Sequence, residues 1–180
     1  MVTRLKVVSR SDALHEGIRF LATFLIVAAA LLFLFTPMES WLQQLEAGQT
    51  QSLLHALGVP TSPAQNPTQF WMNGKLIEIS PLCSGLLEMI LLASAIIVTP
   101  SASVRKKVVG LVIGIFILYV FNLFRMGVTL LQLEHASFSF AEITHDILFR
   151  VILIVGFALL YAVWLNFSSM KKKFVLRGMV

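Results

Sequence analysis

Long apolar stretches dominate the chain and predict helices that cross a membrane. Residues 18–35 are apolar apart from Arg19 and Thr23, and two further apolar stretches cover residues 84–98 and 108–131. A membrane-spanning helix needs about 20 mainly apolar residues, and somewhat fewer are enough where the bilayer adapts. Each stretch is therefore predicted to be one transmembrane helix.

A fourth apolar helix is predicted near the end of the chain. Ser139 and Glu142 have the spacing of a capping box, so the helix should start near Phe140 and continue to about Phe167. The fold class predicted from these four segments is an all-α integral membrane protein with four transmembrane helices.

The segment between the first two spans combines an amphipathic helix with a β-hairpin. Residues 38–58 place leucines and a tryptophan among Glu and Gln, a spacing typical of a helix on a membrane surface. Prolines follow, and then Asn73-Gly74 stands between apolar and β-branched residues. That dipeptide is a strong signal for a two-residue hairpin turn. The hairpin leads directly to Pro81 and Cys83.

The distribution of charge predicts the orientation in the membrane. The sequence is 57% hydrophobic and 13% charged, with a formal net charge of +5. Basic residues occupy the N-terminus, the 99–107 loop and the C-terminal tail. In residues 37–80 the only Lys or Arg is Lys75. By the positive-inside rule both termini are cytoplasmic, and the protein belongs in the cytoplasmic (inner) membrane. Topology and anionic lipids account for the basic residues, so nucleic acid is not an expected partner.

This orientation divides the chain into five parts. The first span could also be a signal peptide, but Thr36-Pro37 follows it in place of a small-residue cleavage site, so a retained span is predicted. The predicted parts are a basic cytoplasmic N-terminus (1–17), the first span (18–36), an extracytoplasmic loop (37–80), a three-span core (81–167) and a basic cytoplasmic tail (168–180).

Cys83, the only cysteine, stands where the extracytoplasmic loop meets the second span. Pro81 suits the first turn of a helix, which would place Cys83 near free backbone N–H groups and the positive end of the helix dipole. Such surroundings favour a nucleophilic thiolate, and the same N–H groups can hold an oxyanion. The alternative is that Cys83 is a small apolar packing residue.

Polar residues recur along the third span near its outer end. Asn122, Arg125, Thr129 and Gln132 are three or four residues apart, so they form one stripe on an otherwise apolar helix. Such a stripe is expected to face protein or water. For Arg125 alone, extension of the side chain to the outer headgroups is the alternative.

The fourth helix supplies a histidine on the same side of the membrane. His145 lies in its second turn, and His135 in the preceding linker is a weaker competitor for the same role. Arg150 is four residues after Asp146, so these two are interpreted as a structural pair. Glu88, one turn into the second span, is expected to pair with Arg125 or Arg150.

Metal ions and other cofactors are not expected. Glu142 and His145 have the spacing of one ligand pair of a di-metal helical bundle, but the sequence contains a single copy. The remaining ligands of such a centre have no counterpart in the other predicted helices.

Together these motifs resemble the exosortase/archaeosortase family. The resemblance covers about residues 70–157 and is based on Cys83-Ser84-Gly85, Asn122-x-x-Arg125 and His145, in that order. It implies a multi-pass cysteine enzyme that cuts C-terminal sorting signals and transfers the protein to an acceptor. Many members have about eight spans, so the chain resembles the short members, and Phe149 stands where a glycine is common.

By this resemblance Cys83 is the nucleophile, with Arg125 and His145 as its catalytic partners. The expected substrate is an exported protein with a short C-terminal motif, one span and a basic tail. Two other classes stay open, a non-catalytic membrane assembly subunit and a small transporter. The residues expected to support the site are Ser84, Gly85, Glu88, Asn122, Thr129 and Arg150.

Overall fold

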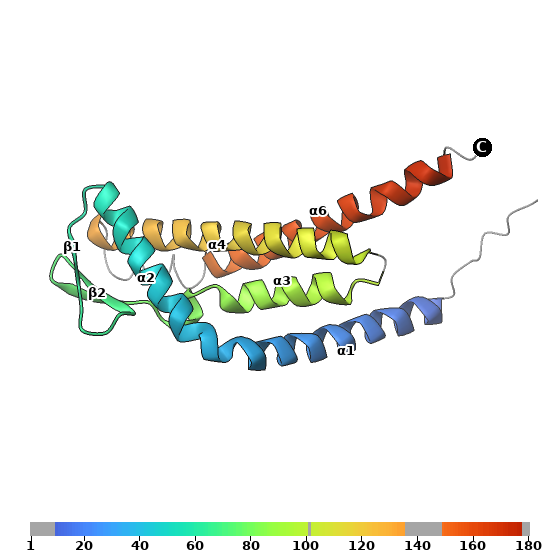
Figure 1. Cartoon of the computed structure of the whole chain (residues 1–180), viewed down its shortest axis with the longest axis horizontal. Coiled ribbons are helices and arrows are strands. Elements are labelled where there is room, and N and C mark those ends of the chain that lie inside the picture. The colour runs from blue at the N-terminus through green and yellow to red at the C-terminus, as the bar shows by residue number, and fades with distance from the viewer. Residues whose placement is uncertain (1–9, 101, 136–148, 178–180) are drawn as a thin grey trace, which may run out of the picture.

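In a computed structural model, four helices lie alongside one another and a small sheet covers one end of them (Figure 1). The structure describes residues 10–100, 102–135 and 149–177. The short, apolar helix α3 is central, because it contacts the other three helices of the bundle. These four helices are α1 (Arg10–Phe35), α3 (Leu86–Val98), α4 (Val104–His135) and α6 (Phe149–Arg177).

Three of the helices are long and apolar enough to cross a membrane, which confirms a helical membrane protein. They lie within residues 14–56, 104–133 and 151–168. The second predicted span is helical over only the 13 residues of α3, roughly 20 Å at 1.5 Å per residue. That length is less than the hydrocarbon thickness of about 30 Å, so α3 alone does not establish a fourth span.

The predicted amphipathic segment is one helix, α2 (Glu39–Ala56), joined to α1 through the 3-10 helix η1 (Thr36–Met38). Its buried face is not the leucine-rich one. Trp41 is 58% exposed and Leu57, just past the helix end, is 54% exposed. The side of α2 that contacts α4 is instead polar or small at four of five positions, and these five buried residues are Gln43, Glu46, Ala47, Thr50 and Leu54.

The predicted hairpin is confirmed and has a third strand. β2 (Gln69–Met72) pairs antiparallel with β3 (Lys75–Glu78) through a turn in which Asn73 has φ 50° and Gly74 has φ 75°. These positive φ values are the reason for the Asn-Gly sequence. The third strand, β1 (Thr61–Pro63), pairs with the other side of β2 and was not predicted, since its proline indicated a break. Proline is tolerated there because β1 is an edge strand.

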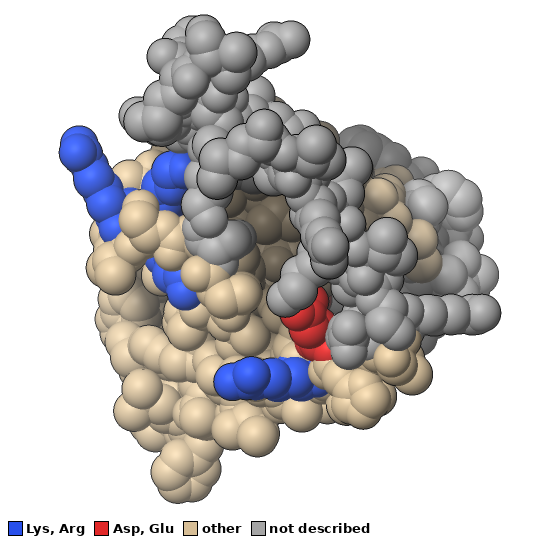
Figure 2. Space-filling model, turned by 90° about the vertical axis from the view of Figure 1, so that its right-hand side faces the viewer, with Lys and Arg blue, Asp and Glu red and all other residues tan. Residues whose placement is uncertain are grey.

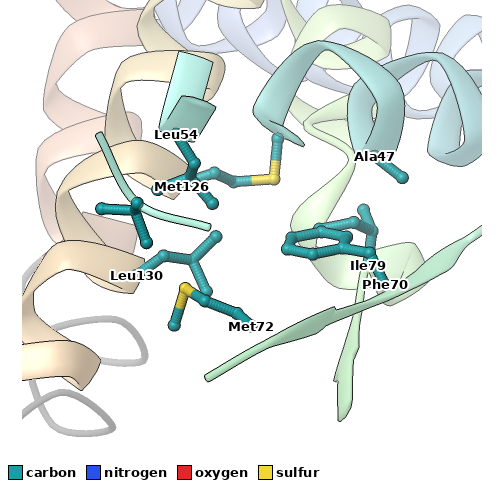
Figure 3. Packing of buried hydrophobic residues seen from close by; sticks show 8 residues of the cluster. Ala47, Leu54, Phe70, Met72, Ile79, Met126 and Leu130 are labelled. Carbon is teal, nitrogen blue, oxygen red and sulfur yellow. The ribbon is translucent and has the colours of Figure 1, made fainter. Parts of the chain in front are cut away.

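A hydrophobic core joins the sheet to α2 and α4 (Figure 3). Phe70 and Met72 of β2 are almost fully buried, and Lys75 Nζ donates to the backbone carbonyl of Leu133 at 3.4 Å. Cys83 packs partly against this core, so the core also positions the turn that carries the thiol. The labelled members are Ala47, Leu54, Phe70, Met72, Ile79, Met126 and Leu130.

The opposite end of the bundle is basic. The turn between α3 and α4 and the C-terminal end of α6 lie there, away from the sheet (Figure 1). Seen from that end, Lys and Arg side chains reach the described surface at several places (Figure 2). Lys106 Nζ donates to the carbonyl of Ser168, and Trp164 Nε1 donates to the carbonyl of Lys106 at 3.1 Å. The basic loop is thus tied to α6 at the end that charge predicts to be cytoplasmic.

Candidate active site

The thiol lies on a tight turn before α3, not in the first turn of that helix. Pro81–Cys83 form the 3-10 helix η2, and α3 starts only at Leu86. The two are separated because Gly85 adopts the left-handed conformation, with φ +66°. The prediction that Cys83 lies in the first turn of the second span's helix was therefore wrong, although Pro81 does begin a helical turn as expected.

The backbone carbonyl of Cys83 accepts two hydrogen bonds from α4. Asn122 Nδ2 donates at 2.8 Å and Arg125 Nη2 donates at 3.0 Å. Asn122 is 0% and Arg125 1% exposed. Both side chains come from α4 and bind the same carbonyl oxygen. Cys83 precedes Asn122 by 39 residues and Arg125 by 42 residues in the chain. They therefore fix the turn that presents the thiol.

Cys83 is only partly buried, and its sulfur contacts a serine hydroxyl. Ser80 Oγ lies 3.2 Å from the Cys83 Sγ in hydrogen-bonding geometry. A hydroxyl donated to sulfur favours the anionic form, which is the nucleophile. Ser84 is buried and donates to the carbonyl of Pro81 at 2.9 Å, which closes the turn.

Gly85 is required for a second reason besides its φ angle. A Cβ added to Gly85 would lie 3.1 Å from Cγ of Asn122, closer than ordinary van der Waals contact. The small residue lets the Asn122 amide approach the turn closely enough to bond the Cys83 carbonyl. This explains why Ser84 and Gly85 follow the cysteine directly.

The polar stripe on α4 faces the protein, as predicted. Arg125 is buried, so extension of its side chain to the outer headgroups is excluded. Thr129 donates its hydroxyl to the carbonyl of Arg125 at 2.9 Å, inside the same helix. Gln132 is half-buried further along this face.

Sequence reasoning missed Glu46, a buried carboxylate beside the site. Glu46 is 0% exposed, and its Oε1 accepts from Asn122 Nδ2 at 2.9 Å. Burial raises the pKa of Glu46, although the hydrogen bond from Asn122 and the positive charge of Arg125 act in the opposite direction. The available signal was the spacing of Gln43, Glu46 and Thr50, which places the three on one face of the predicted amphipathic helix.

Comparison with known proteins gives the family. A model of the transmembrane exosortase family (Exosortase_EpsH) matches residues 13–162, most of the chain. The chain belongs to the transmembrane exosortase family. The exosortases are generally cysteine peptidases and transpeptidases of protein sorting. No curated protein and no solved structure matches the chain.

Several residues expected in the exosortase site are not placed by the structure. His145, Asp146 and the single Glu142–His145 spacing lie outside the described residues, and of Arg150 only its place in α6 is described. Their roles stay predictions. Glu88 is half-buried on α3, where its charge acts on Glu46, and its pairing with Arg125 or Arg150 also stays a prediction.

Proposed function

We propose that this exosortase is a membrane-embedded cysteine protease/transpeptidase that cleaves C-terminal sorting signals of exported proteins. The observation that carries the proposal is the geometry at Cys83. The only cysteine of the chain is half-buried on a turn, and its backbone carbonyl is held by the buried side chains of Asn122 and Arg125. A cysteine that merely filled space would not need a buried guanidinium to fix its backbone.

The site belongs at the outer face of the cytoplasmic membrane. Lys107 and Arg125 are 18 residues apart on α4, about 27 Å at 1.5 Å per residue. This is nearly the thickness of a hydrocarbon core of about 30 Å. If the basic end of α4 lies at the cytoplasmic interface, Arg125 and Cys83 lie close to the outer one.

Four spans remain the proposed topology. The turn and Gly85 would continue α3 toward the outer interface, which offsets the shortness of that helix. Irregular backbone is tolerated at membrane depth only where protein covers it and satisfies its polar groups. Ser84 and Gly85 are buried, and the Cys83 carbonyl is hydrogen-bonded to α4, so this requirement is met.

The chemistry proceeds in two acyl-transfer steps. The Cys83 thiolate attacks the carbonyl carbon of the scissile peptide bond, and collapse of the tetrahedral adduct breaks the C–N bond. His145 gives a proton to the departing amine, which leaves a thioester on Cys83. Water, an amine or a hydroxyl of the acceptor then attacks the thioester, loses its proton to His145 and releases the thiolate. The positive charge of Arg125 favours the thiolate and the developing oxyanion.

A transporter fits this architecture less well than an enzyme. A conducting path needs polar groups along its length, but two grooves between the spanning helices are lined by apolar residues over most of the bundle, and the groove lined by Arg105 and Lys106 lies at its basic end. One groove of about 300 Å³ runs between α3, α4 and α6 and is lined by apolar residues such as Leu92, Ile113 and Leu160. Such a groove suits the apolar span of a substrate better than a solute. An assembly subunit without catalysis stays the second candidate function.

Co-expression with a tagged exported reporter tests the proposal. The reporter carries a candidate sorting signal from the same genome, with its short motif, span and basic tail. We expect Cys83→Ala and Cys83→Ser to abolish its shortening, because an alcohol is far less ionised than a thiol at neutral pH. Membrane insertion should be unchanged in both variants. Continued processing by Cys83→Ala would assign the cleavage to another nucleophile.

A further inference from the structure

We propose that Glu46 is a further positioning residue of the Cys83 site, acting through the side-chain amide of Asn122. Glu46 lies on α2, outside the segment that carries the Cys-Arg-His motif, and 76 residues before Asn122. The inference rests on the proposed role of Cys83 and adds α2 to the machinery that presents it.

The first support is the geometry of the shared amide. Asn122 Nδ2 carries two hydrogens, and its acceptors are Glu46 Oε1 at 2.9 Å and the Cys83 carbonyl at 2.8 Å. These hydrogens lie in one plane at a fixed angle. An acceptor that holds the first hydrogen therefore aims the second. Rotation of the amide by half a turn would bring its oxygen against two acceptors, which is repulsive.

The second support is that the other end of the amide has no anchor in the described part of the chain. Oδ1 of Asn122 is buried and has no hydrogen-bond partner among those residues. The orientation of the Asn122 side chain thus depends on what Nδ2 donates to. Apart from the Cys83 carbonyl that it positions, that acceptor is Glu46.

The third support is the cost of burying Glu46. Its side chain is 0% exposed, and its second oxygen, Oε2, is buried without a hydrogen-bond partner in the described part of the chain. A carboxylate in such a place is unfavourable unless charge or hydrogen bonds compensate it. An apolar residue would pack α2 against α4 at lower cost. The acidic side chain is therefore explained by its hydrogen bond to Asn122, because burial outweighs the nearby charge of Arg125 and raises the pKa of Glu46.

The test compares two neutral variants of nearly equal length, Glu46→Gln and Glu46→Met. Both lack the carboxylate charge, but only Gln offers an oxygen that can accept from Asn122. The difference between them isolates the hydrogen bond. The readout is the rate at which a membrane-impermeant maleimide labels Cys83 in oriented membranes, divided by the total labelled after denaturation. This measurement needs no substrate, so its outcome does not depend on whether Cys83 cleaves a sorting signal.

We expect Glu46→Gln to label at a rate near or above that of the wild type. Glu46→Met should label about fivefold more slowly than Glu46→Gln, the factor that an ordinary hydrogen bond corresponds to. The reason is that a loosened turn no longer holds the Cys83 sulfur beside Ser80. Asn122→Ala should slow labelling at least as much, because it also removes the direct bond to the Cys83 carbonyl. Adding Glu46→Met to Asn122→Ala should slow labelling no further, because Glu46 acts only through Asn122.

Gln49→Ala is the matched control. Tyr119 donates its hydroxyl to Gln49 Oε1 at 2.6 Å, so this variant also breaks a polar link between α2 and α4, one turn away. It does not touch Asn122 and should label like the wild type. If Glu46→Met does not accumulate in membranes, Glu46→Ala takes its place. Equal rates in Glu46→Gln and the apolar variant, or additive effects with Asn122→Ala, would overturn the proposal.

Discussion

Arg125 donates from Nη2 to the backbone carbonyl of Cys83 at 3.0 Å while its side chain is only 1% exposed. The arginine therefore acts on the backbone of the proposed nucleophile, in addition to any effect of its charge on the thiol. This double role makes the planar guanidinium, and not a positive charge alone, the feature that the site requires.

The first prediction follows from that geometry. Arg125→Lys should lower reporter processing by at least about tenfold, because a lysine ammonium is a point charge and cannot hold the carbonyl while reaching the same neighbours. The measurement is the initial rate of reporter shortening at matched membrane levels. Arg150→Lys is the control and should be milder if Arg150 only pairs with Asp146. Equal losses in both would place Arg150 in the site.

The second prediction concerns Gly85. Gly85→Ala should slow maleimide labelling of Cys83 severalfold and reduce processing, because it strains a left-handed residue and drives a Cβ to within 3.1 Å of Asn122. Gly74→Ala is the matched control. It imposes comparable strain at φ +75°, but its Cβ would meet nothing within 4 Å. Gly74→Ala should keep the labelling rate, so equal effects would show that strain alone matters.

The third prediction is the topology. Protease-cleavable tags at both termini should be protected from protease added to spheroplasts, because the basic segments stay cytoplasmic. A cleavable tag between residues 60 and 68 should be cut. The measurement is the fraction of each tag that is cleaved when protease is added without detergent, so that the membrane stays closed. An accessible C-terminus would contradict four spans, and would support α3 as a helix that does not complete its crossing.

The parts of this site that the sequence predicted are those with a local signal. Asn73-Gly74 specifies its own turn, and the three- and four-residue spacing from Asn122 to Gln132 places these residues on one helix face. For Glu46 the local spacing shows only that it shares a helix face with Gln43 and Thr50, not where that face points. Its partner is 76 residues away, and only the packing of α2 against α4 shows that the polar face of α2 points inward. The separate turn at Cys83 was missed because a glycine can adopt either a helical or a left-handed conformation. The sequence around Gly85 does not show which one it adopts, and in the structure it is left-handed.

The last prediction concerns His145, which the sequence places on the same side of the membrane as Cys83. If His145 is the base for Cys83, its protonated ring stabilises the thiolate, so the two groups titrate as a pair. The rate at which maleimide labels Cys83, measured against pH, should then have its midpoint below the ordinary thiol pKa of about 8.5. His145→Ala removes the cation and should move the midpoint to higher pH. His135→Ala, at the end of α4, serves as the control and should leave it in place. A midpoint that moves with His135 and not with His145 would give the role of base to His135.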